Sequence, residues 1–224
     1  MAVLEKGRRN VQILKQGQYS PMKVQHQVAI IYCGTQGLIL DVPTDKVLEF
    51  EKEYLEYLDL KHKDTLDKIN ELVLNIRVGG NDLCHMFGFR RHSDESIHRI
   101  RPISNIFSDI ITVYGMDYVV SGPVWEYYAG SNWDKGLLQE IQDDKLCGFT
   151  GKTVIHPNQI SIVNSAYRVS RSDFNDAQSI LNWNKNSNSF VSGSLSRERM
   201  NEYKTHNNWA QQTLFLAEAY GIQD

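Results

Sequence analysis

The sequence has few cysteines, and they follow no recognisable pattern. Cys33, Cys84 and Cys147 are the three cysteines of the 224-residue chain, and no Cys-x-x-Cys pair occurs. An odd number of widely spaced cysteines argues against a disulfide framework and against a zinc site built on paired thiolates. We therefore expect a protein of a reduced intracellular compartment, the cytoplasm.

Long apolar runs and an excess of positive charge are also missing. The longest apolar run, 28–33, is far shorter than the roughly 20 residues that cross a membrane, and residues 2–6 do not form the apolar stretch of a signal peptide. Lys and Arg number 24 against 27 Asp and Glu, a net charge of -3, so a general nucleic-acid binder is not expected. The chain is 41% hydrophobic, enough for the core of one large domain or two small ones.

The stretch GFTGKTVIHP, residues 148–157, lacks one glycine of a nucleotide-binding loop. A P-loop needs a glycine, any four residues and then Gly-Lys-Ser/Thr, so that successive backbone N–H groups point at phosphate. Residues 151–153, Gly-Lys-Thr, supply the ending, but Leu146 stands where the first glycine belongs. A β-branched pair, 154–155, follows in place of a helix N-terminus. The stretch therefore predicts a short strand over 153–155.

The hydrophobic pattern changes near residue 70, from helical spacing to strands that alternate with helices. The expected helices span 4–14, 24–33, a segment from Thr44 onward, 104–114, 137–144, 159–167, 172–183 and 197–220. The expected strands span 72–78, 118–120 and 153–155. Strands separated by helices are typical of parallel βαβ units. We therefore predict an α/β protein with a helical module (1–69), a partial β/α barrel (70–170) and a helical extension (171–224).

The first part of the chain carries the motifs ILKQGQYSPM and QVAIIYCGTQG. Through them, residues 2–69 resemble the C-terminal helical domain of the F-type ATP synthase alpha subunit. The resemblance implies that Gln16 and Gln18 lie beside the adenine of a nucleotide and that ATP synthase subunits are partners. The central nucleotide domain of that family is absent from this chain. Because phosphate and metal contacts supply most of the grip on a nucleotide, both glutamines also fit a reading as ordinary surface residues.

The second part carries LNIRVGGNDLCHMFGFRR, DYVVSGPVWEYY, GFTGKTVIHPNQISIVNSAYRVS and MNEYKTHNNWA. These motifs resemble C–C bond lyases of TIM-barrel fold, related to the citrate lyase beta subunit and the HpcH/HpaI aldolase-like enzymes, and cover the C-terminal half of that barrel. The resemblance implies Mg²⁺-dependent cleavage of a small carboxylate or acyl thioester, with Asp82 as a metal ligand. The strand that brings the second carboxylate is not present, so Glu53, Glu56 or Glu71 would have to replace it.

Further candidates lie near the predicted strand ends, where TIM barrels place reactive groups. Arg90 and Arg91 follow a Gly-Phe pair and are candidates for binding an anion, with a surface role expected for one of the two. Lys152 and His156 flank the last predicted strand and are candidates for contacting substrate, although a solvated lysine and a structural histidine are equally ordinary readings. Glu126, between two aromatic residues, is a candidate acid or base, or an exposed glutamate on a packed wall.

Three parallel strands do not close a barrel, because the TIM fold uses eight. We therefore expect the uncovered part of the sheet to be shielded by the N-terminal helices or by a second copy of the chain, in a homo-oligomer. Three functions follow: a lyase-like protein, an ATP synthase alpha-type fragment that docks onto other subunits, or a fusion that keeps the activity of neither.

Overall fold

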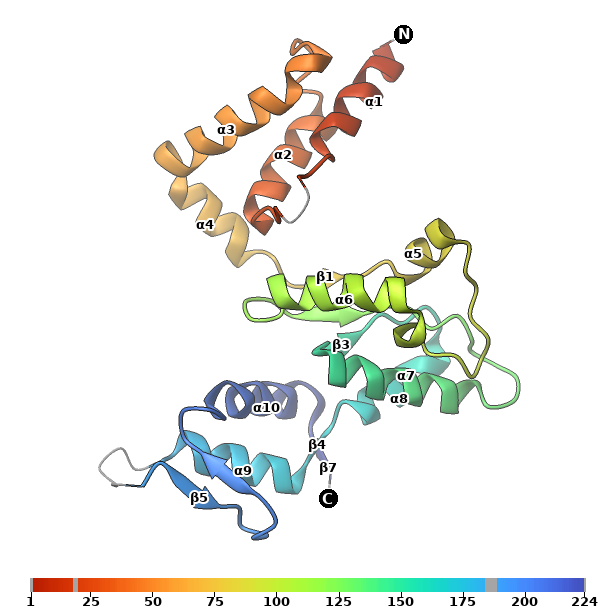
Figure 1. Cartoon of the computed structure of the whole chain (residues 1–224), viewed down its shortest axis with the longest axis vertical. Coiled ribbons are helices and arrows are strands. Elements are labelled where there is room, and N and C mark those ends of the chain that lie inside the picture. Colours follow the sequence, from red (N-terminus) through yellow and green to blue (C-terminus); the bar gives the residue numbers. More distant parts are fainter. Residues whose placement is uncertain (1, 18–19, 184–188, 224) are drawn as a thin grey trace. The chain divides into compact units, whose positions relative to one another are not determined.

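The computed structural model describes residues 2–17, 20–183 and 189–223. The chain forms two compact units, Met1–Leu74 (unit 1) and Asn75–Asp224 (unit 2) (Figure 1). The change from unit 1 to unit 2 thus falls a few residues after the change in hydrophobic pattern near residue 70. In the part of the chain that the structure describes, no helix combines the length and the apolar character needed to cross a membrane.

Unit 1 is helical. It contains α1 (Ala2–Ile13), α2 (Val24–Gln36), a short 3-10 helix η1 (Thr44–Lys46), α3 (Val47–Lys61) and α4 (Lys63–Glu71). Its core contains Ile13, Ile30 and Val47, one from each of α1, α2 and α3. Gly34 lets α1 and α2 approach closely, because a Cβ at this position would lie 2.5 Å from the Cδ1 atom of Ile13. The helical spacing of the sequence therefore reflects a small helical bundle.

Unit 2 contains a three-stranded parallel sheet in the order β1 (Ile76–Arg77), β2 (Val120–Gly122), β3 (Gly151–Lys152). A mixed α/β fold with short parallel strands is confirmed, and the described residues form no closed barrel. The third strand was predicted at 153–155, which is wrong. Residues 151–152 pair with β2, whereas Val154 and Ile155 lie beyond that partner and are exposed.

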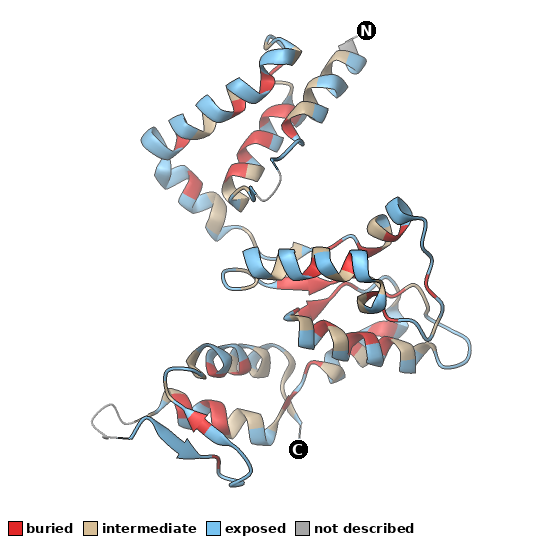
Figure 2. Ribbon diagram, viewed as in Figure 1, coloured by how far each residue is buried: buried red, intermediate tan, exposed pale blue. Residues whose placement is uncertain are grey.

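One face of this sheet is covered by helices. The connecting helices are α5 (Gly80–Phe87), η2 (Ile97–Arg99), α6 (Arg101–Tyr114), α7 (Trp133–Cys147) and α8 (Pro157–Ala166). Val78 and Val120 pack with Ile103 and Phe107 of α6 in the main core; buried residues are red in Figure 2. A second core lies between α7 and α8, around Tyr167. The alternating strands and helices of the sequence thus form one covered layer.

The C-terminal region is less helical than predicted. It consists of β4 (Val169–Ser170), α9 (Arg171–Leu181), β5 (Val191–Gly193), β6 (Met200–Glu202), α10 (Asn207–Tyr220) and β7 (Ile222–Gln223). The last helix was expected to begin at residue 197, but 200–202 pair with β5 in an antiparallel hairpin and the helix begins at Asn207. Arg197 has φ 61°, in the left-handed region, which ends helical geometry there. Part of the predicted polar loop, 184–188, lies outside the described residues.

Candidate functional site

The two faces of the parallel sheet carry different polar groups. In a strand, successive side chains point to opposite faces, and residues paired in parallel register share a face. The register pairs Arg77 with Ser121 and Ser121 with Gly151, whereas Gly122 pairs with Lys152. Arg77 and Lys152, both at strand ends, therefore lie on opposite faces of the sheet.

Lys152 lies on the face that α7 covers, in a group of charges that we call the buried ionic cluster: Arg91, His98, Glu140, Asp144 and Lys152. The Nζ atom of Lys152 donates to Glu140 Oε1 at 3.0 Å and to Asp144 Oδ2 at 2.7 Å. His98 Nε2 lies 2.7 Å from Asp144 Oδ1. The side chains of Glu140 and Asp144 are 0% exposed and that of Lys152 is 1% exposed, so this lysine is held away from solvent.

Arg91 completes the buried ionic cluster. Its guanidinium pairs with Glu140 and donates to the carbonyl oxygen of Val124 at 2.8 Å. Glu140 also accepts the backbone N–H of Ile97 at 2.9 Å. The two cations Arg91 and Lys152 thus balance the two carboxylates, and each carboxylate has several donors. Buried charges are stable only when they are paired and hydrogen-bonded in this way. Because the partners come from α7 and from the end of β3, the cluster fixes α7 against the sheet.

The other face of the sheet carries Asn75, Arg77, Ser121 and Thr153, which we call the open face. Arg77 Nε donates to Thr153 Oγ1 at 3.4 Å, across the middle strand, and Asn75 Nδ2 donates to Ser121 Oγ at 2.7 Å. Arg77 is exposed and forms no ion pair with any residue that the structure describes. Arg77 was not among the residues predicted from the sequence, although the alternation in Asn75-Ile76-Arg77-Val78 places it opposite the apolar residues.

The structure brings two of the predicted site residues together. Arg90 Nε lies 3.6 Å from Glu126 Oε2, and the Arg90 side chain is 88% exposed whereas that of Glu126 is 25% exposed. Glu126 also contributes to the surroundings of Cys84. Burial raises the pKa of the Cys84 thiol, and the charges of Glu126 and Glu140 act in the same direction against the opposing effect of Arg91. Cys84 is therefore a buried thiol that stays protonated near neutral pH.

His156 lies at the start of α8, apart from the buried ionic cluster. Its Nδ1 atom accepts the backbone N–H of Asn158 at 3.2 Å, which caps the helix. Its ring stacks on Tyr128, with 4.2 Å between the ring centroids. Because Nδ1 is an acceptor, the neutral ring carries its proton on Nε2. His156 therefore has a structural task as the cap of α8.

Asp82 is exposed in the first turn of α5. A magnesium ion requires about six oxygen ligands in near-octahedral geometry, some of them waters or substrate oxygens. Among residues 2–17, 20–183 and 189–223, no three or more His, Cys, Asp or Glu side chains are grouped so that they could hold a metal ion. Asp82 is thus not part of such a group among the described residues, and magnesium binding at Asp82 stays a prediction.

The two glutamines predicted to lie beside an adenine are in unit 1. Gln16 follows α1 and is exposed. Gln18 lies outside the residues that the structure describes. The structure thus gives one exposed amide side chain at this position.

Comparisons with curated proteins find similarity to ATP synthase subunits over a minor part of the chain. The ATP synthase subunit alpha of Christiangramia forsetii is 59% identical over 69 residues, 31% of this chain and 13% of that protein. The subunit of Flavobacterium johnsoniae is 57% identical over 67 residues, and that of Parabacteroides distasonis is 49% identical over 78 residues. The chain spans only 13% to 15% of the length of these relatives. No solved structure matches the chain.

A family model matches most of the chain. The model describes a C–C bond lyase of the TIM-barrel fold, and it matches residues 36–222. The match begins at the end of α2 in unit 1, before residue 70, where the resemblance to the lyases was expected to begin. It includes the whole parallel sheet, the buried ionic cluster and the open face. This chain therefore belongs to the family of C–C bond lyases of the TIM-barrel fold.

Proposed function

We propose that the open face of the sheet binds a small carboxylate, or an acyl thioester that carries one, and that the protein acts as a carbon–carbon lyase in the cytoplasm. In this proposal the parallel sheet is part of a TIM-type barrel whose interior is the open face. The observation that carries it is the state of Arg77, which is exposed and lacks an ion pair among the described residues, whereas Lys152 and Arg91 are buried with carboxylates.

The chemistry requires an anchor for the substrate and a path for a proton. A guanidinium binds a carboxylate through two parallel hydrogen bonds, which fixes its orientation, and positive charge stabilises the enolate that forms as the carbon–carbon bond breaks. We assign the anchor to Arg77 and the proton acceptor to Glu126, with Arg90 beside it. Lys152 and His156 hold the ends of β3 and α8 in place.

Magnesium enters this proposal through Asp82 alone. When bound, the ion would supply positive charge to substrate oxygens. Because one carboxylate is a weak ligand set, we expect tight binding of the ion only together with a carboxylate substrate. Calorimetric titration of Mg²⁺, with and without malate, into the wild-type protein and into Asp82→Ala measures this. Equal binding by the two proteins would remove Asp82 as a ligand.

The test of the anchor is calorimetric titration of malate into the wild-type protein, Arg77→Met and Arg101→Met. Arg101 is also exposed, at the start of α6, and so serves as a matched control. We expect the affinity to fall by about tenfold or more in Arg77→Met, because a charge-assisted pair is lost, and to stay unchanged in Arg101→Met. Malate that binds both variants equally would contradict the proposal.

A second candidate function rests on unit 1. The identity of 59% over 69 residues to an ATP synthase alpha subunit favours a helical module that docks onto alpha or beta subunits of an ATP synthase. Co-purification of unit 1, expressed within the full chain, with such subunits tests this candidate. If neither malate nor the subunits bind, the third hypothesis holds, an inactive fusion of two protein segments.

A further inference from the structure

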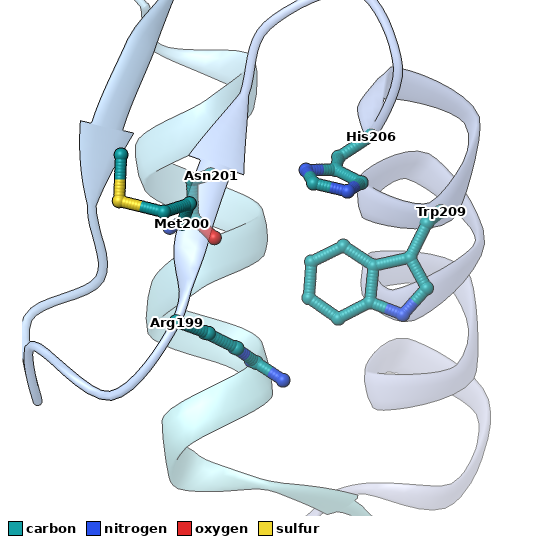
Figure 3. A pocket seen from close by; sticks show the side chains of 5 residues that line it. All are labelled: Arg199, Met200, Asn201, His206 and Trp209. Carbon is teal, nitrogen blue, oxygen red and sulfur yellow. The ribbon is translucent and has the colours of Figure 1, made fainter.

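We propose that a cavity in the C-terminal region of unit 2 binds an adenine ring. The cavity has a volume of about 380 Å³ and is lined by Arg199, Met200, Asn201, His206 and Trp209 (Figure 3). Its volume falls in the range of roughly 300–1,000 Å³ that is typical of small-molecule sites. These residues lie outside the open face, and binding here does not depend on the proposed lyase function.

The apolar part of the cavity wall near α10 is the Trp209 ring, because the Met200 side chain points away from Trp209 (Figure 3). Met200 comes from β6 on one side, and Trp209 comes from α10 on the other (Figure 3). Trp209 is 39% exposed, so its ring presents apolar surface to a ligand. A planar ring in the cavity would stack on the indole, which is a favourable contact for a nucleobase.

Asn201 supplies a polar edge that lacks an internal partner. The residue is 4% exposed, lines the cavity, and its side-chain amide forms no hydrogen bond with any described residue. The amide is not among the fully buried polar groups that lack a partner in the described residues, so it is reached from the cavity and is a candidate for bonding to a ligand there. An asparagine amide matches the neighbouring donor and acceptor of adenine, N6 and N7, in a two-point contact.

His206 adds a second donor from the opposite wall. Its Nδ1 atom accepts the backbone N–H of Glu202 at 2.9 Å, which leaves the proton of the neutral ring on Nε2. The ring lines the same cavity as Trp209 and Asn201 (Figure 3). An N–H group here is suited to one of the ring nitrogen acceptors of adenine, which a carbocyclic ring does not have.

The charge at the cavity favours a neutral ring over a free anion. Arg199 Nη2 pairs with Asp173 Oδ1 at 2.6 Å, and Arg199 Nε pairs with Asp176 Oδ2 at 2.7 Å. The hydrogen bond to Asp173 is the main cause that raises the pKa of Arg199, so the guanidinium stays charged. Because two carboxylates face one guanidinium, Arg199 is already neutralised. It fixes β6 against α9 and lies 5.3 Å from the Trp209 ring, which orders the cavity before a ligand arrives.

The experiment is calorimetric titration of adenosine into the full chain and two matched variants. Trp209→Leu removes the stacking surface, and Phe215→Leu removes an exposed aromatic ring on the same helix that does not line the cavity. We expect adenosine to bind the wild-type protein and Phe215→Leu equally, and Trp209→Leu at least about tenfold more weakly. No measurable binding to the wild-type protein at millimolar adenosine, or equal binding by the two variants, would overturn the proposal.

Further arms of the titration define the ligand. Asn201→Asp keeps the shape of the side chain but removes its donor, so we expect weaker adenosine binding. A circular dichroism spectrum checks that this variant folds, and Trp209→Leu carries the test if it does not.

The Gln16→Ala variant should bind adenosine as the wild-type protein does, which separates this cavity from unit 1. Uridine that binds as tightly as adenosine would contradict adenine recognition. Tighter binding of AMP than of adenosine would identify a nucleotide as the ligand, and weaker binding a nucleoside.

Discussion

The two faces of the parallel sheet hold their cations in opposite ways. Lys152, on the face covered by α7, has a side chain that is 1% exposed and two carboxylate partners. Thr153, the next residue, turns to the other face and contacts the exposed Arg77. The position of a cation at the end of a parallel strand therefore does not by itself show that the cation binds substrate. The face on which it lies decides whether its charge is already neutralised.

The largest expected effect on stability comes from a substitution in the buried ionic cluster, on the face of the sheet that α7 covers. Lys152→Met leaves Glu140 and Asp144 short of a counter-charge in a buried site, so we expect a loss of about 3–5 kcal/mol in the free energy of unfolding. Lys135→Met on the exposed side of the same helix, α7, is the control and should change stability by less than about 0.5 kcal/mol. Urea unfolding measures both. Equal stability of the two variants would mean that the cluster does not hold this face together.

An intermediate effect on the free energy of unfolding is expected at alkaline pH, and it comes from Tyr167. Its hydroxyl donates to the carbonyl oxygen of Gly151 in β3 at 2.8 Å. Burial, and next the charge of Asp144, raise the pKa of Tyr167 well above its usual value of 10.0. The folded state therefore keeps this proton when the unfolded state loses it, so the stabilisation is complete below pH 10.0 and is lost as the pH rises further.

The matching variant is Tyr167→Phe, compared with the wild-type protein by urea unfolding at a series of pH values above and below the usual tyrosine pKa. We expect the variant to be less stable near neutral pH, because a hydrogen bond is lost, but to lose stability less steeply at high pH, by up to about 1.4 kcal/mol per pH unit. Tyr220, whose pKa burial also raises, keeps part of the dependence in both proteins. Parallel pH profiles for the two proteins would contradict the assignment to Tyr167.

The smallest expected change in stability is on the open face. Arg77→Met removes an exposed side chain with one long hydrogen bond to Thr153, so we expect a change of less than about 1 kcal/mol in the free energy of unfolding. The same variant should lose malate binding, as described above. A large loss of stability would show that Arg77 has a structural role like that of Lys152, and the contrast between the two faces would not hold.

Much of the architecture follows from the sequence in physical terms. The apolar residues before Gly79-Gly80 and before Gly122 mark strands, and the helical spacing between them marks the covering helices, so parallel βαβ order was predictable. The position of β3 was not predictable, because the β-branched residues Val154 and Ile155 favour a strand as strongly as residues that do pair in a sheet. Whether they pair depends on where β2 ends.

The candidate site was less predictable than the fold. Arg90 and Glu126 were both identified from the sequence, and the structure shows them in contact. Arg77, in contrast, stands within a strand-like run and was not considered. The hairpin at 200–202 was missed as well, because its residues also fit the start of a helix and only pairing with β5 excludes that.

The sequence by itself determined the family and the order of strands and helices, because both are written in local motifs and in the spacing of apolar residues. Only the tertiary structure decided which charged side chains neutralise one another. Arg91, Glu140 and Lys152 are far apart along the chain, and their pairing depends on the register of the sheet and the packing of α7. Electrostatic partners are set by distance in space and by burial, and neither is visible in the spacing of residues along the chain.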